Sequence, residues 1–260
     1  MKTILKVLTA VVFAFGLLLV PTNIFAQTST TGTIEGSVTD STGAVVPGVT
    51  VLVSGANLIR PQSATTNDEG TYRVSSLPPG RYTVIIEAVQ GFARYEATDV
   101  EVNLSKSSGV NVTLQPTGGT TEVTVVAGAN IDQTTNTSGT NVTTEQFSNF
   151  PTQRTVQSIY TIAPTVTRSG LRDASGRDRD PSVAGSSGPE NNYILDGVNT
   201  TDPAFGGSGA NLPFEFVQEV EVKTGAFGAE YGLSTGGIFN VVTKSGSNEF
   251  RGDVFAYYTG

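Results

Sequence analysis

The chain has no cysteine and no histidine among its 260 residues. Their absence excludes disulfide frameworks, thiolate or imidazole zinc sites, haem ligation, and Ser-His-Asp or Cys-His catalysis. Carboxylates, hydroxyls, Lys and Arg are the groups left for chemistry, and they form no recognisable hydrolase motif. We therefore expect no enzyme, no catalytic residue, no cofactor and no metal site.

Positive charge is also scarce. The chain carries 15 Lys and Arg against 23 Asp and Glu, which gives a formal net charge of -8. Binding to a nucleic acid needs clustered Lys and Arg that displace counterions from phosphates. An acidic surface without such clusters argues against a nucleic-acid partner.

Leu, Lys and Glu are sparse beyond the N-terminus, whereas Val and Thr are abundant and there are 30 Gly. β-Branched residues favour strands over helices. The composition therefore predicts a mainly β chain, and its length allows a targeting segment and about two domains.

The one long apolar run lies at the N-terminus, from Val7 to Val20, after Lys2 and Lys6. Fourteen residues are too few for a spanning helix, which needs about 20. Pro21 ends the run, and Ile24-Phe25-Ala26 precedes Gln27 in the manner of a cleavage site. We expect residues 1–26 to be a secretory signal peptide, so that the protein is exported.

Residues 30–115 read as short strands separated by turn residues, a pattern typical of a β-sandwich. In the run from Tyr82, the side chains of Tyr82, Val84, Ile86 and Ala88 are expected to face inward. Ile85 is apolar as well, which indicates a central strand. The expected strands are Thr33–Thr39, Val49–Val53, Gly70–Val74, Tyr82–Ala88, Val100–Leu104 and Val110–Leu114.

This region also resembles the carboxypeptidase-regulatory-like, or prealbumin-like, domain. The resemblance is carried by GTIEGSVTDSTGAVVPGVTVLV, TNDEGTYRVSSLPPGRYTVIIEAVQGF and VNVTLQP. It implies a carbohydrate-binding-like β-sandwich without zinc. Tyr72, Tyr82 and Phe92 are expected in the core, with contact to a sugar as the alternative.

Residues 116–127 begin with a Pro/Gly/Thr-rich hinge and end in a short β-prone run, EVTVVA. An isolated strand of this kind can add to the sheet edge of a partner protein, which is called β-augmentation. Its position in the chain and its sequence resemble the TonB box of TonB-dependent transporters, and this resemblance implies TonB as the partner. The alternatives are a last strand of the sandwich or a first strand of the next domain. The candidate partner-binding residues are Glu122, Val123, Thr124, Val125, Val126 and Ala127.

Residues 128–247 combine two short helices with buried strands. A capped helix is expected after Thr143 and a second over Arg154–Ile162, followed by a solvated, mixed-charge loop over Arg168–Gly188. YIL at 193–195, Val217–Val222 and Ile238–Val242 are expected strands. Glu219 and Glu221 give the second of these an acidic face, which needs water or basic partners. Arg154 and Arg168 are the candidate partners.

In order, FPTQRTVQSIYTIAPTV, NNYILDGVNTTDP and VQEVEVKTGAFGAEYG resemble the plug domain of Oar-like TonB-dependent outer-membrane transporters. The resemblance extends through STGGIFNVVTKSGSNEFRGDVFAYYTG. Residues 248–260 would then begin a transmembrane β-barrel that is truncated at Gly260. The implied fold is a β-sandwich followed by a mixed α+β plug and a first barrel strand.

Such a protein would lie in the outer membrane of a Gram-negative-type bacterium, with the N-terminal domain on the periplasmic side. It would contact lipid through the barrel, take up a small ligand, a peptide or an oligosaccharide, and be driven by TonB with its inner-membrane energising complex. The alternative is a secreted β-sandwich adhesion or carbohydrate-binding protein in which residues 122–127 are only structural.

Overall fold

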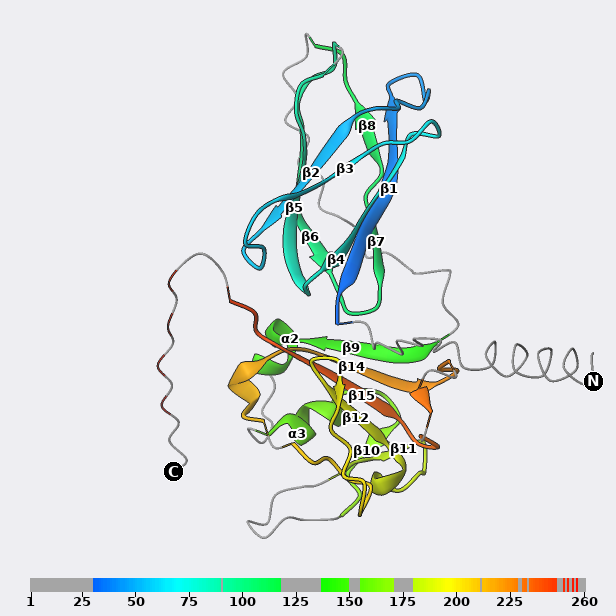
Figure 1. The fold of residues 1–260 in the computed structure, drawn as a ribbon, viewed down its shortest axis with the longest axis vertical. Coiled ribbons are helices and arrows are strands. Elements are labelled where there is room, and N and C mark those ends of the chain that lie inside the picture. The colour runs from blue at the N-terminus through cyan, green and yellow to red at the C-terminus, as the bar shows by residue number, and fades with distance from the viewer. Residues whose placement is uncertain are drawn as a thin grey trace, which may run out of the picture.

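A computed structural model describes most of the chain, and two domains are visible (Figure 1). The described residues are 30–89, 91–117, 137–149, 155–170, 180–210, 212–228, 231–232, 234–246, 250, 252, 254 and 256. The expected signal peptide, the candidate residues 122–127 and most of the expected barrel start lie outside this set.

The first domain is a sandwich of two sheets. One sheet has the order β4-β1-β7, with β8 also paired to β1, and the other has the order β3-β2-β5-β6. β1 pairs antiparallel with β4 but parallel with both β7 and β8. The strands are β1 (Gly32–Asp40), β2 (Thr50–Gly55), β3 (Gln62–Thr65), β4 (Thr71–Leu77), β5 (Gly80–Ile86), β6 (Tyr95–Val102), β7 (Ser107–Gly109) and β8 (Val112–Leu114).

The predicted alternation along β5 is confirmed up to Ile86. Tyr82, Val84 and Ile86 are buried in one apolar core, and β5 lies between β2 and β6 as a central strand. Ala88 is exposed, contrary to the prediction, because the strand ends two residues before it. Tyr72 is a core residue as predicted; its hydroxyl donates a hydrogen bond to the carbonyl of Val110.

The second domain has a five-stranded sheet of order β13-β12-β15-β14-β9. β12 and β15 are parallel, whereas β14 is antiparallel to both β15 and β9. The sheet strands are β9 (Ser138–Thr143), β12 (Asn192–Leu195), β13 (Val198–Asn199), β14 (Val217–Gly225) and β15 (Ile238–Thr243). The smaller elements are α2 (Thr144–Ser148), α3 (Val156–Tyr160), β10 (Val166–Thr167), β11 (Ser182–Val183), η1 (Gly188–Glu190) and η2 (Phe214–Phe216).

Both predicted helices form, but each is shorter than its sequence pattern. α2 begins after Thr143 with a capping box to Gln146, which supplies partners for backbone N–H groups at the helix start. α3 buries Ile159 and Tyr160 against the sheet, and the Tyr160 ring lies 4.3 Å from that of Phe239. The helices thus close one face of the sheet over a second apolar core.

The predicted solvated loop is wrong at its C-terminal end. Asp180 is buried, and its carboxylate accepts a hydrogen bond from the backbone N–H of Ser208. Val183 is also buried, and β11 pairs with β10. Among the described residues, no helix is both long enough and apolar enough to cross a membrane.

Candidate functional site

Strand β14 buries charge on one face and apolar side chains on the other. Val220 and Val222 belong to the apolar core, whereas Glu219, Glu221 and Lys223 project to the opposite side. These three residues are only 1%, 5% and 7% exposed. Buried charges need compensating partners.

A register shift places Val217 in the same core as Val220. Strict alternation would put Val217 on the face of Glu219, but the pairing of β14 with β15 is irregular between Val217 and Glu219. A β-bulge of this kind inserts a residue and re-aims the side chains that follow it. The charged face therefore begins at Glu219.

Part of the first domain packs on the charged face of β14. Its turn between β6 and β7 touches the second domain, and Ser105 in that turn has a left-handed backbone with φ of 56°. The Leu104 N–H donates to Glu219 Oε1 over 3.1 Å, and the Ser105 hydroxyl donates to Glu221 Oε2 over 3.1 Å. We call this contact between the 103–106 turn and the β14 charged face the seam.

Glu219 is held through one of its two carboxyl oxygens. Oε1 also accepts a hydrogen bond of 2.5 Å from Asn141 on β9, whose side chain donates to the carbonyl of Leu104 as well. Oε2 is buried and has no hydrogen-bond partner among the described residues. Burial raises the pKa of Glu219 to about 7, although the Asn141 and Leu104 hydrogen bonds act in the opposite direction.

Glu221 is paired with Lys223, two residues along the same strand. Lys223 Nζ lies 3.5 Å from Glu221 Oε1 and donates a 2.6 Å hydrogen bond to the hydroxyl of Tyr231. Burial tends to lower the pKa of Lys223, but Glu221 and Tyr231 outweigh it, so the pKa is raised. Asn240 adds a 3.3 Å hydrogen bond to Glu221 Oε2.

The acidic face has a basic partner, as predicted, in Lys223. Arg154 was an expected partner but lies outside the described residues. The donors around Glu219 and Glu221 are Lys223, two asparagines and the 103–106 turn of the first domain. Sequence reasoning identified the acidic face and missed the domain that covers it.

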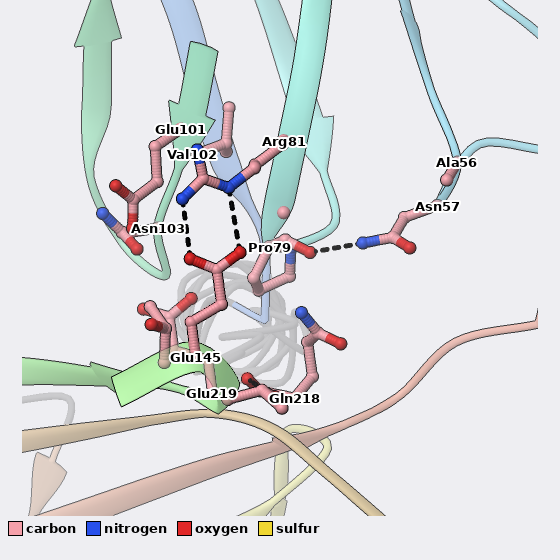
Figure 2. A pocket seen from close by; sticks show the side chains of 13 residues that line it. Ala56, Asn57, Pro79, Arg81, Glu101, Val102, Asn103, Glu145, Gln218 and Glu219 are labelled. Atoms are coloured by element: carbon pink, nitrogen blue, oxygen red, sulfur yellow. Dashed lines mark hydrogen bonds and ion pairs between the residues drawn. The ribbon is translucent and has the colours of Figure 1, made fainter. Parts of the chain in front are cut away.

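A second contact between the domains lies at the exposed rim of the seam. The Arg81 guanidinium on β5 donates to both carboxylate oxygens of Glu145 on α2, at 3.0 and 2.6 Å, and also to Asp99 at 2.7 Å. Figure 2 shows the two parallel bonds between Arg81 and Glu145. The guanidinium lowers the pKa of the Glu145 carboxyl.

A cavity of about 170 Å³ lies between these two contacts, with residues of both domains in its wall (Figure 2). Within the described ranges, no three Asp or Glu side chains converge in a way that would hold a metal ion. The geometry provides hydrogen bonding and charge pairing between domains. The lining residues are Ala56, Asn57, Pro79, Gly80, Arg81, Glu101, Val102, Asn103, Thr143, Thr144, Glu145, Gln218 and Glu219.

The sequence-predicted partner-binding residues Glu122–Ala127 lie outside the described part of the chain. They fall between β8, which ends the sandwich, and β9, which is the edge strand of the second sheet.

Two family models match the chain. Residues 33–115 match the carboxypeptidase regulatory-like domain, and residues 131–238 match the TonB-dependent receptor plug domain. These two ranges contain the sandwich and most of the five-stranded sheet.

Two individual relatives agree with the family models. The TonB-dependent transporter Oar of Myxococcus xanthus is 38% identical over 263 residues, which cover 96% of this chain and 24% of Oar. The ferrienterobactin receptor of Escherichia coli K12 is 30% identical over 132 residues, 45% of this chain and 18% of that receptor. The solved FpvAI–pyocin S2 complex matches with a TM-score of 0.37 and 27% identity, over 45% of this chain and 15% of that one. The chain thus spans about a quarter of the length of Oar.

Proposed function

Since this chain belongs to the Oar-like TonB-dependent receptors, we propose that it gates energised uptake of a substrate across the outer membrane. The observation that carries the proposal is similarity to Oar over 96% of the chain, with a regulatory-like domain and a plug domain in sequence. The protein would perform no covalent chemistry.

In this proposal the plug closes a wide barrel whose first strand begins at about residue 248. Barrels of about 22 strands have a lumen that must be closed by a plug. Substrate, whether a small ligand, a peptide or an oligosaccharide, would bind to outward loops. TonB, driven by the inner-membrane complex, would then bind residues 122–127 on the periplasmic side and rearrange the plug.

The place of residues 122–127 in the chain supports this role. They connect the last strand of the sandwich to β9, an edge strand of the plug sheet. A force applied there acts directly on β9, which is hydrogen-bonded to β14 alone among the described strands. The signal peptide at 1–26 would bring the protein into the periplasm before it reaches the outer membrane.

The sandwich would act as an accessory or regulatory module docked on the plug. The seam and the Arg81–Glu145 contact support this role, since both join the sandwich to plug elements. The rival function, a secreted sugar-binding or adhesion sandwich, has less support. Tyr72 and Tyr82 are buried in the sandwich core rather than exposed for stacking on a sugar ring.

Binding of the periplasmic domain of TonB to the Val125→Pro variant tests the partner strand. Proline removes a main-chain N–H, so a complex held by main-chain hydrogen bonds should weaken by about tenfold or more. Affinity would be measured with the purified 260-residue chain by pull-down and calorimetry.

Val125→Thr is the matched control, because threonine keeps the N–H group and the β-branched shape. We expect it to bind TonB about as tightly as the unmodified chain. Undiminished binding of the proline variant would refute strand pairing at this segment.

A further inference from the structure

We propose that Glu219 is a proton-binding site that controls how tightly the sandwich docks on the plug. In its neutral form the side chain stabilises the seam, and in its ionised form it loosens the seam. The inference rests on the contact between the two domains and is independent of substrate or TonB.

The hydrogen bonds around Glu219 are asymmetric. Oε1 accepts hydrogen bonds from the Leu104 N–H and from Asn141, which is enough to compensate that oxygen. Oε2 is fully enclosed with no partner among the described residues, in a residue that is 1% exposed. An ionised carboxylate left in this state loses hydration at Oε2 and gains nothing in return.

A second buried acceptor lines the same cavity. Asn103 Oδ1, in the turn that contacts Glu219, also has no hydrogen-bond partner among the described residues. A proton on Glu219 Oε2 turns this oxygen from an acceptor into a donor. One proton thereby removes a buried charge and places a donor in a cavity wall where, among the described residues, Asn103 Oδ1 is a buried acceptor without a partner.

The surrounding charges do not neutralise Glu219. On its own strand, Glu221 opposes its ionisation, and Lys223 is already paired with Glu221. From the sandwich, Lys106 favours ionisation, but among the described residues it forms no ion pair with Glu219. The cavity wall adds three further charged groups from β5, β6 and α2, namely Arg81, Glu101 and Glu145. The Arg81 guanidinium is occupied by Glu145 and Asp99.

The direction of the pH dependence follows from linkage. The docked carboxyl has a pKa of about 7, whereas a solvated glutamate has one of 4.5. The docked state therefore binds a proton more tightly, so its stabilisation is complete below pH 4.5 and is lost as the pH rises through 7. Each unit of pKa difference corresponds to a tenfold change in the docking equilibrium. Between pH 5 and pH 8 we expect docking to weaken roughly 10- to 100-fold.

Hydrogen exchange at the Leu104 N–H measures this equilibrium directly, because that amide donates to Glu219. Exchange reports the open fraction even when it is far below 1% of the population. On the 260-residue chain, and after correction for intrinsic exchange rates, the fraction of molecules in which the sandwich is undocked from the plug should increase between pH 5 and pH 8. The Val84 amide in the sandwich core is the internal control, and its protection should not follow that of Leu104.

The Glu219→Gln variant separates protonation from the other contacts. Glutamine is neutral and has a donor at one terminal atom, so it mimics the protonated acid. We expect its Leu104 amide to be protected at pH 8 as strongly as the unmodified chain is at pH 5, without a pH dependence. Glu101→Gln, an exposed carboxyl in the same cavity wall, should retain the full pH dependence of the unmodified chain.

Three results would overturn the inference. The first is a flat or opposite pH profile for Leu104 in the unmodified chain. The second is an equal change at Val84, which would report unfolding of the sandwich instead of undocking. The third is a pH dependence in Glu219→Gln that matches that of the unmodified chain. If the first result came with tightening by added sodium or ammonium, a small cation in the cavity would take the place of the proton.

Discussion

Two contacts between the domains differ in how far their charged residues are buried: Glu219 in the seam, and Arg81 with Glu145 at its rim. Glu219 is buried, so its charge state has a large effect on the energy of the seam. Arg81 and Glu145 are about half and two-thirds exposed, respectively. Water screens an exposed ion pair, so this contact is expected to contribute less to docking than the buried seam, even with its two parallel hydrogen bonds.

Arg81→Lys tests this difference. Lysine cannot form two parallel hydrogen bonds to Glu145, so docking should weaken by less than about 1 kcal/mol. Hydrogen exchange at Leu104 would measure the change at low and at moderate salt, and the effect should shrink as salt increases.

Arg73→Lys is the control for that variant. Arg73 forms a similarly exposed but longer pair with Glu35 inside the sandwich, with a separation of 3.8 Å. The substitution should leave Leu104 exchange unchanged. A loss of several kcal/mol in Arg81→Lys would show that the rim contact, and not the seam, dominates docking.

Residue-level prediction from the sequence was correct where neighbours along the chain decide the outcome. The acidic face of β14 followed from alternation, and so did its need for partners. The partner itself did not follow, because Leu104 and Glu219 are 115 residues apart. No local pattern links a backbone N–H in one domain to a carboxylate in another.

At the scale of elements, most strands of the sandwich were predictable and two were missed. β3 has the sequence QSAT and β7 has the sequence SSG, which are short and polar and carry no alternation of apolar side chains. Each pairs with an apolar neighbour, β2 and β1 respectively. Their strand conformation comes from the pairing rather than from their own residues.

At Gly36 the backbone of β1 lies close to the chain segment that joins its two parallel neighbours, β7 and β8. A Cβ atom built at Gly36 would lie 1.9 Å from the carbonyl oxygen of Val110, in the chain between β7 and β8. This close backbone approach requires glycine.

Gly36→Ala should therefore destabilise the sandwich by about 1–3 kcal/mol, because the backbone must move to relieve the contact. Thermal unfolding followed by calorimetry would measure the change. Gly225→Ala is the control: a Cβ at Gly225 meets no atom within 4 Å, so its effect should stay within about 0.5 kcal/mol. Equal stability of the two variants would contradict the close packing of β1 on Val110.

At the scale of the whole molecule, the two domains have separate apolar cores. Val84 lies in the core of the sandwich and Val220 in the main core of the plug. What joins the domains is the polar seam and its rim. A junction of hydrogen bonds and charges can be rearranged with a smaller loss of buried apolar surface than a shared core.

We therefore expect calorimetry to show two unfolding transitions. Val84→Ala and Val220→Ala remove similar buried volume, and each should cost about 2 kcal/mol in one domain. Each variant should lower one transition by several degrees and leave the other nearly unchanged. A parallel shift of both transitions would show that the domains unfold as one cooperative unit.

The β character of the chain, most of the sandwich strands, the two short helices and the family resemblance could all be predicted from the amino-acid sequence. These features depend on local periodicity, turn residues and motif order, all of which are read along the chain. Which residues contact the charged face of β14 became clear only from the folded protein. The fold also places Val217 in a core with Val220 and buries one oxygen of Glu219 with no donor among the described residues. Burial and pairing between distant segments set these features, because desolvation depends on every atom around a group and not on its neighbours in sequence.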